Sequence, residues 1–222
     1  MALLTDRIWE KKGVGTMSQT AYIRSIASFT LIAACLTTLG ALTSYQWSPS
    51  WLLILGSFVG SMVCIFLFQG SDNPLLSFLG VSGMSFLMGL MIGPVTAMYH
   101  IANVVQAVVL TAGAMGLMSL AGIMVPAVFR GWGPYLMAGL TLLIIVQFSQ
   151  LIFLALGFEQ AARMTWITWA GVLVFLGLTA YDWARALSLP YTLDNAIDVS
   201  GGLILDAINL FLRFLQLGKG KK

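Results

Sequence analysis

The feature that most limits the fold of this 222-residue chain is a series of seven long apolar runs. Each run has about the 20 residues that a helix needs to cross the hydrocarbon core of a bilayer. The apolar residues are continuous and do not alternate with polar ones, which argues against a transmembrane β-barrel. We therefore predict an all-α, multi-pass membrane protein, with helices near residues 22–43, 50–68, 75–97, 103–127, 134–157, 163–187 and 197–217.

The composition supports this class of protein. Hydrophobic residues make up 59% of the chain and charged residues 9%, whereas a soluble domain carries roughly 25% charged residues. We predict a polar N-terminal tail over residues 1–21, a seven-helix transmembrane domain over 22–217 and a basic C-terminal tail over 218–222, with no further soluble domain. The short, prokaryote-like layout favours a bacterial cytoplasmic membrane, with an endoplasmic-reticulum-type membrane as the second choice.

The net charge of +3 comes from basic residues that gather near the two ends of the chain. Basic residues beside membrane spans set topology and contact anionic lipids. The predicted partner is therefore the lipid bilayer, and nucleic acid is not expected as a partner.

Polar side chains line one face of the last predicted helix. Asp206 lies about ten residues into that helix, roughly 15 Å from its start and near the bilayer centre. A charge there costs roughly 2.5–3.5 kcal/mol on insertion scales, so the position is a candidate functional site. Steps of four, four, three and four residues place on one stripe Asp198, Gly202, Asp206, Asn209 and Arg213. The alternative is a buried polar seam that only holds the bundle together.

A second acid, Asp182, lies near the end of the preceding predicted helix, 24 residues before Asp206. The midpoint between them is Asp194, in the connecting stretch "SLPYTLDNA". An antiparallel hairpin that turns there would place both carboxyls at one depth, whereas a turn nearer Pro190 would offset them by on the order of 10 Å. The alternative is that Asp182 is an interfacial carboxylate beside Arg185.

Contact between Asp182 and Asp206 would couple pH to helix packing. Two carboxylates in a low-dielectric site cannot both ionise cheaply, so they share one proton and titrate as a unit. The doubly ionised pair offers the hard oxygen ligands that Ca²⁺ prefers, so transient Ca²⁺ contacts are expected at both acids. The single histidine and two scattered cysteines supply no other metal motif. We predict no resident cofactor and no enzymatic activity.

The C-terminal part of the sequence resembles the Bax inhibitor-1 family, also called transmembrane Bax inhibitor motif proteins. The similarity lies in "AYDWARAL" followed by "LILDAINLFLRFLQLG", and in "GMSFLMGLMIGPV" at residues 83–95. The resemblance implies six helices wrapped around a central, hydrophobic seventh helix. It also implies a pH-sensitive calcium leak controlled by a pair of aspartates, carried over here onto Asp182 and Asp206.

One stretch departs from that family pattern. Calcium-leak relatives from bacteria have a basic residue near the end of the second helix that latches to the aspartates. The corresponding stretch here reads "CIFLFQGSDNP", with Gln69 and no Arg or Lys. Three explanations stay open: the latch is missing, Arg213 or Arg185 substitutes for it, or gating differs. Other family members lack the aspartates and are implicated in restraining a membrane-anchored quality-control protease.

We therefore predict a passive calcium leak that closes when Asp182 and Asp206 share a proton. Asp206 would be the pore-side switch and Asp182 its partner, while Asn209 and Arg213 would shape the path. Two alternatives remain. One is an interaction protein that binds a membrane protease through its N-terminal tail and loops, and the other is a proton-coupled cation exchanger.

Overall fold

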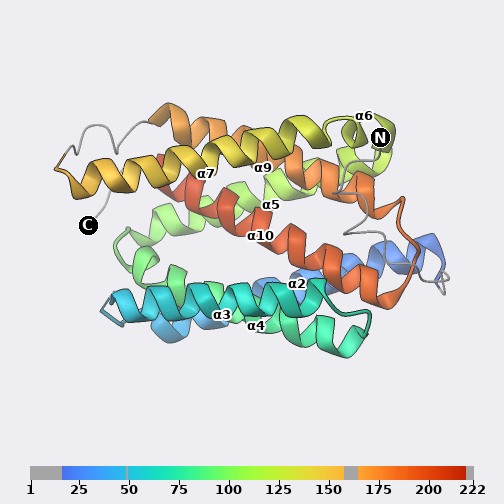
Figure 1. The fold of residues 1–222 in the computed structure, drawn as a ribbon, viewed down its shortest axis with the longest axis horizontal. Coiled ribbons are helices and arrows are strands. Elements are labelled where there is room, and N and C mark those ends of the chain that lie inside the picture. The colour runs from blue at the N-terminus through green and yellow to red at the C-terminus, as the bar shows by residue number, and fades with distance from the viewer. Residues whose placement is uncertain (1–16, 49, 158–164, 219–222) are drawn as a thin grey trace. The chain divides into compact units, whose positions relative to one another are not determined.

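The fold is given by a computed structural model that describes residues 17–48, 50–157 and 165–218 (Figure 1). The described part is helical and contains no strand. Its elements are α2 (Gln19–Ser44), α3 (Trp51–Gln69), α4 (Pro74–Ala97), α5 (Ile101–Met124), α6 (Pro126–Arg130), α7 (Gly133–Ala155), α9 (Thr165–Ala186) and α10 (Leu193–Leu217). The predicted tails fall largely outside the described residues, which begin at residue 17 and end at residue 218.

Seven of the described helices are long and apolar enough to cross a membrane, and the short α6 is the exception. This confirms the prediction of an all-α, multi-pass membrane protein. Many large apolar side chains are exposed on these helices, among them Leu31, Phe66 and Leu173, each at 67–69% exposure. Such an apolar surface suits contact with lipid, because a soluble protein rarely exposes so many large apolar side chains to water.

The short polar stretches between the apolar runs supply helix caps. The side chains of Ser18, Ser50 and Asn73 accept hydrogen bonds from the first backbone N–H groups of α2, α3 and α4, respectively. Thr192 does the same for α10, accepting from Asn195 N at 3.1 Å. These caps satisfy backbone donors that the helix itself leaves without partners.

The fourth predicted span, 103–127, ends earlier than expected. Helix α5 stops at Met124, and Pro126 begins the separate five-residue helix α6. Proline has no backbone N–H and clashes with the preceding turn, so it breaks a continuing helix but suits the first position of a new one.

The chain forms two compact units. Unit 1 contains α2, α3, α4, the end of α9 from Arg185 and the first half of α10 through Ile204. Unit 2 contains α5, α6, α7, α9 through Ala184, and the second half of α10 from Leu205. Helix α10 thus contributes one half to each unit.

In unit 1, glycines let α2 and α4 approach backbone to backbone. A methyl group added at Gly89 would collide with the Thr37 carbonyl, and one at Gly40 would collide with the Phe86 carbonyl. Small residues at these positions bring the two membrane helices close together. Gly56 behaves differently, because nothing lies within 4 Å of an added methyl group there.

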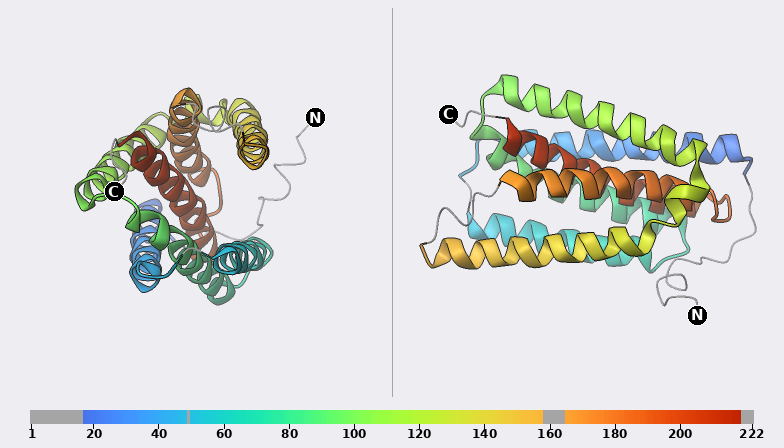
Figure 2. Two further views of the ribbon diagram at one scale, coloured as in Figure 1. Left: turned by 90° about the vertical axis from the view of Figure 1, so that its left-hand side faces the viewer. Right: turned by 90° about the horizontal axis from the view of Figure 1, so that it is seen from above.

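In unit 2, α9 forms the centre of the packing, next to the second half of α10 (Figure 2). Its glycines contact α7 and α10, and Gly122 of α5 packs against the Ala180 carbonyl of α9. The apolar core of this unit consists of Leu143, Ile167, Val172, Phe175, Leu178 and Leu210.

Candidate functional site

The predicted acids of the α9–α10 hairpin, Asp182 and Asp206, both belong to unit 2. Three pairs of residues contact one another across these two helices: Thr179 with Asp206, Gly171 with Arg213, and Thr168 with Gln216. From the first pair to the second, the chain moves eight residues back along α9 and seven residues forward along α10. From the second pair to the third, it moves three residues back along α9 and three forward along α10. This constant spacing defines an antiparallel register.

The register determines how far Asp182 and Asp206 are offset along the helix axis. Asp206 lies opposite Thr179, and Asp182 follows Thr179 by three residues on α9. At 1.5 Å per residue, the two acids are offset by about 4.5 Å along the axis, roughly half the larger offset considered from the sequence. The reason is that α10 begins at Leu193, so the chain turns before Asp194.

Asp206 is buried, with 6% of its surface exposed, and Asp182 is half-buried. Positions three apart share one face of a helix, so Thr179 and Asp182 both lie on the side of α9 that meets α10. The carboxyls of Asp182 and Asp206 interact electrostatically. The structure therefore places the two acids at one helix interface, within unit 2.

The hydroxyl of Thr179 links Asp206 to the backbone of α9. Its oxygen lies 2.9 Å from the Phe175 carbonyl, 3.3 Å from Asp206 Oδ2 and 3.3 Å from Met115 Sδ. One hydroxyl has one proton, so it donates to one acceptor at a time. When it donates to Phe175, its oxygen can accept a hydrogen bond from a neutral Asp206 carboxyl. When Asp206 is ionised, the hydroxyl can donate to the carboxylate instead.

The other members of the predicted stripe are divided between the two units. In unit 2, the Asn209 amide donates to the Leu205 carbonyl of its own helix at 2.9 Å, and Arg213 is buried against Gly171. Unit 1 holds the remaining predicted site residues, Asp198, Gly202 and Arg185, all half-buried. There, Asp198 and Arg185 interact electrostatically with the buried phenol of Tyr22.

Two features of the hairpin escaped the sequence analysis. Thr179 is fully buried beside Asp206, and only its spacing of three residues from Asp182 could have drawn attention to it. Asp194 was expected in the loop, yet it lies in the first turn of α10, is 6% exposed and accepts a 2.7 Å hydrogen bond from Ser77. A carboxylate at that position also suits the positive end of the helix dipole.

The predicted latch position stays without a basic residue, because α3 ends at Gln69. Arg213 lies seven residues beyond Asp206, two turns or about 10.5 Å along α10. Its guanidinium contacts Gly171, two turns from the acid pair. Among the described residues, the side chains that act on Asp206 are those of Thr179 and Asp182.

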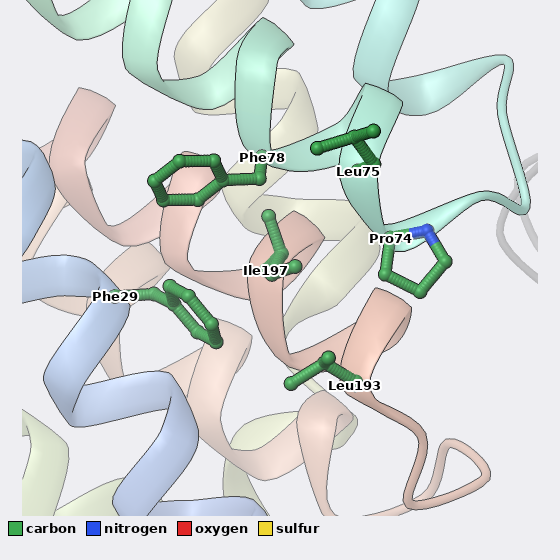
Figure 3. Close-up of a pocket in the computed structure, with 6 residues that line it drawn as sticks. All are labelled: Phe29, Pro74, Leu75, Phe78, Leu193 and Ile197. Atoms are coloured by element: carbon green, nitrogen blue, oxygen red, sulfur yellow. The ribbon is translucent and has the colours of Figure 1, made fainter.

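Unit 1 also contains an apolar pocket of about 300 Å³ between α2, α4 and α10 (Figure 3). The side chains of Phe29, Phe78 and Ile197 face one another there, and Pro74 at the start of α4 closes one side. The lining is Phe29, Pro74, Leu75, Phe78, Leu193 and Ile197. None of these side chains has a polar group, so the pocket cannot replace the water shell of an ion.

A model of the family described as "Inhibitor of apoptosis-promoting Bax1" matches residues 19–222. The chain is also similar to individual bacterial proteins. The Inner membrane protein YbhL of Escherichia coli (strain K12) is 31% identical over 155 residues, which is 62% of this chain and 63% of the relative. An "Uncharacterized protein" of Deinococcus radiodurans is 31% identical over 146 residues, 63% of this chain and 61% of the relative.

The chain thus spans somewhat less than two thirds of each of these relatives. The family match, in contrast, covers all seven long helices. It includes both stretches that carried the resemblance, the Gly-Pro segment of α4 and the acidic motifs of α9 and α10. The chain is an integral, multi-pass membrane protein, and it belongs to the Bax inhibitor-1 family.

Proposed function

We propose that the protein is a passive, pH-sensitive calcium leak in a bacterial inner membrane, closed when Asp182 and Asp206 share a proton. The observation that carries the proposal is the buried carboxyl of Asp206, which faces Thr179 and interacts with Asp182 across the α9–α10 interface. Placing an acidic side chain inside the bilayer costs free energy, and such residues mark ion or proton pathways in membrane proteins. The name of the relative YbhL supports the choice of membrane.

The protonated pair favours the packed interface. The shared proton leaves the pair with a single negative charge, and Thr179 can donate its one hydroxyl proton to Asp206 Oδ2 or to the Phe175 carbonyl. Loss of the shared proton leaves two negative charges on adjacent helices. At an effective dielectric constant of about 20, two unit charges about 4 Å apart repel by about 4 kcal/mol, and the repulsion falls inversely with distance. This repulsion pushes the helices apart.

The ionised pair is suited to transit and not to storage of Ca²⁺. A protein calcium site supplies about six to eight oxygen ligands. Among the described residues, no group of three or more His, Cys, Asp or Glu side chains gathers in one place. Two carboxylates would attract the ion yet leave most of its water shell in place, so it would bind weakly and leave quickly.

The proposal is tested with purified protein in liposomes that contain a calcium-sensitive dye. We expect dye signal in the wild type to rise as the pH rises from about 6 to about 8, because the shared proton leaves. Asp206→Asn cannot ionise, so its flux should no longer depend on pH. Asp72→Asn is the matched control, since it makes the same change at an exposed loop position.

The flux experiment also separates the proposal from its rivals. No calcium flux at any pH would contradict the leak and favour an interaction protein that modulates a membrane protease. Flux that requires an opposing proton gradient would favour a proton-coupled exchanger. A leak that remains pH-dependent in Asp206→Asn would keep the channel but remove the aspartate gate.

A further inference from the structure

Arg213 is a buried cation without a visible counter-charge. Its side chain is 7% exposed near the C-terminal end of α10. Among the described residues, we find no carboxylate that pairs with it and no carbonyl that accepts its N–H groups. A buried charge normally has a partner, because the loss of its water shell must be offset by close opposite charge. A guanidinium held in this way points to an anionic ligand.

The backbone of α9 is shaped to hold the guanidinium. A methyl group added at Gly171 would lie 2.7 Å from Arg213 Nε and 2.9 Å from Cζ, closer than real side chains approach. The glycine therefore lets the guanidinium approach the backbone of α9 closely. One turn further toward the helix ends, Thr168 donates a long 3.5 Å hydrogen bond to Gln216, so polar groups continue from Arg213 to the surface.

The position along the helices corresponds to the headgroup region of a bilayer. Arg213 lies four residues before the end of α10 and Gly171 six residues after the start of α9, about 6 Å and 9 Å from the helix ends. Trp166 and Trp169 of α9 are 64% and 54% exposed at the same level. Tryptophan is enriched at the membrane–water interface.

We propose that Arg213, with Gln216 beside it, binds the phosphate of an anionic phospholipid headgroup at this end of the α9–α10 hairpin. The guanidinium fork matches two phosphate oxygens, and this geometry favours Arg over Lys. A lipid phosphate already resides at this depth, whereas a free phosphate ion would have to leave water to reach it. Basic sites between membrane helices commonly hold such headgroups. The site does not depend on the calcium leak.

Native mass spectrometry of the purified full-length protein, titrated with phosphatidylglycerol or phosphatidylcholine, tests the proposal. Wild-type protein should bind phosphatidylglycerol at least about tenfold more tightly, because the choline cation neutralises the phosphate of phosphatidylcholine, whereas phosphatidylglycerol keeps a net negative charge for Arg213. Arg213→Gln should remove the preference. Gly171→Ala keeps the charge but displaces the guanidinium, so the preference should fall several-fold. The triple replacement of Lys219, Lys221 and Lys222 by Gln should leave the effect of Arg213→Gln unchanged.

Thermal unfolding of the same proteins guards against a purely structural explanation. In detergent without anionic lipid, Arg213→Gln should be at least as stable as the wild type, because it removes an uncompensated buried charge. Added phosphatidylglycerol should then stabilise the wild type alone. Equal binding of both lipids, an unchanged preference in Arg213→Gln, or full competition by inorganic phosphate would each overturn the proposal.

Discussion

Replacing Thr179 by valine tests the geometry around Asp206 without changing the shape of the core. The hydroxyl is fully buried and lies 3.3 Å from Asp206 Oδ2. Valine has nearly the same volume, so the main loss is a hydrogen-bond partner for a buried carboxyl. Leaving such a group without a partner costs about 1–3 kcal/mol of unfolding free energy, and the long distance argues for the lower half of that range.

A double-mutant cycle isolates this interaction. Asp206→Leu removes the carboxyl, so Thr179→Val should cost little in that background, and the two changes should be coupled by about 1 kcal/mol or more. The assay is reversible unfolding in mixed micelles. Thr111→Val is the matched control, because Thr111 is also buried in unit 2 but donates only to the Ala107 carbonyl of its own helix. Additive effects within about 0.5 kcal/mol would refute the contact between Thr179 and Asp206.

Two further predictions test unit 1 by the same unfolding assay. Gly89→Ala should destabilise by about 1–3 kcal/mol or more, because its methyl group meets the Thr37 backbone, while Gly56→Ala should be neutral or stabilise by up to about 1 kcal/mol; equal effects would contradict the close approach of α2 and α4. Ser77→Ala removes the donor to buried Asp194 and should cost about 1–3 kcal/mol at neutral pH, a loss that should vanish in an Asp194→Ala background, which has no acceptor, if the hydrogen bond is its cause.

The membrane helices could be predicted from the sequence to within a few residues. Their apolar runs are long, and the turn residues between them act locally, as the caps at Ser18, Ser50 and Asn73 show. The end of α5 was predicted three residues too late. The apolar run continues beyond Met124, but Pro126 breaks the helix there. Local chemistry thus determines where each helix begins and ends.

The details of the candidate site could be predicted only in part. Spacing identified Asp182 and Asp206, since ionisable residues are rare in apolar helices. Their offset depends on the register of α9 against α10, which is set by contacts such as Gly171 with Arg213 that no periodicity reveals. Thr179 escaped notice because threonine is common in membrane helices, and its role appears only when Asp206 lies opposite.

The shared proton of Asp182 and Asp206 is observed most directly by infrared spectroscopy of the protein in lipid. We expect a protonated-carboxyl stretch that is present at pH about 6, disappears by about 8 in step with the rise in calcium flux, is absent from Asp206→Asn and is retained in Asp72→Asn. A carboxyl band that Asp206→Asn leaves intact, or one that does not change while the flux changes, would show that the gate works without this proton.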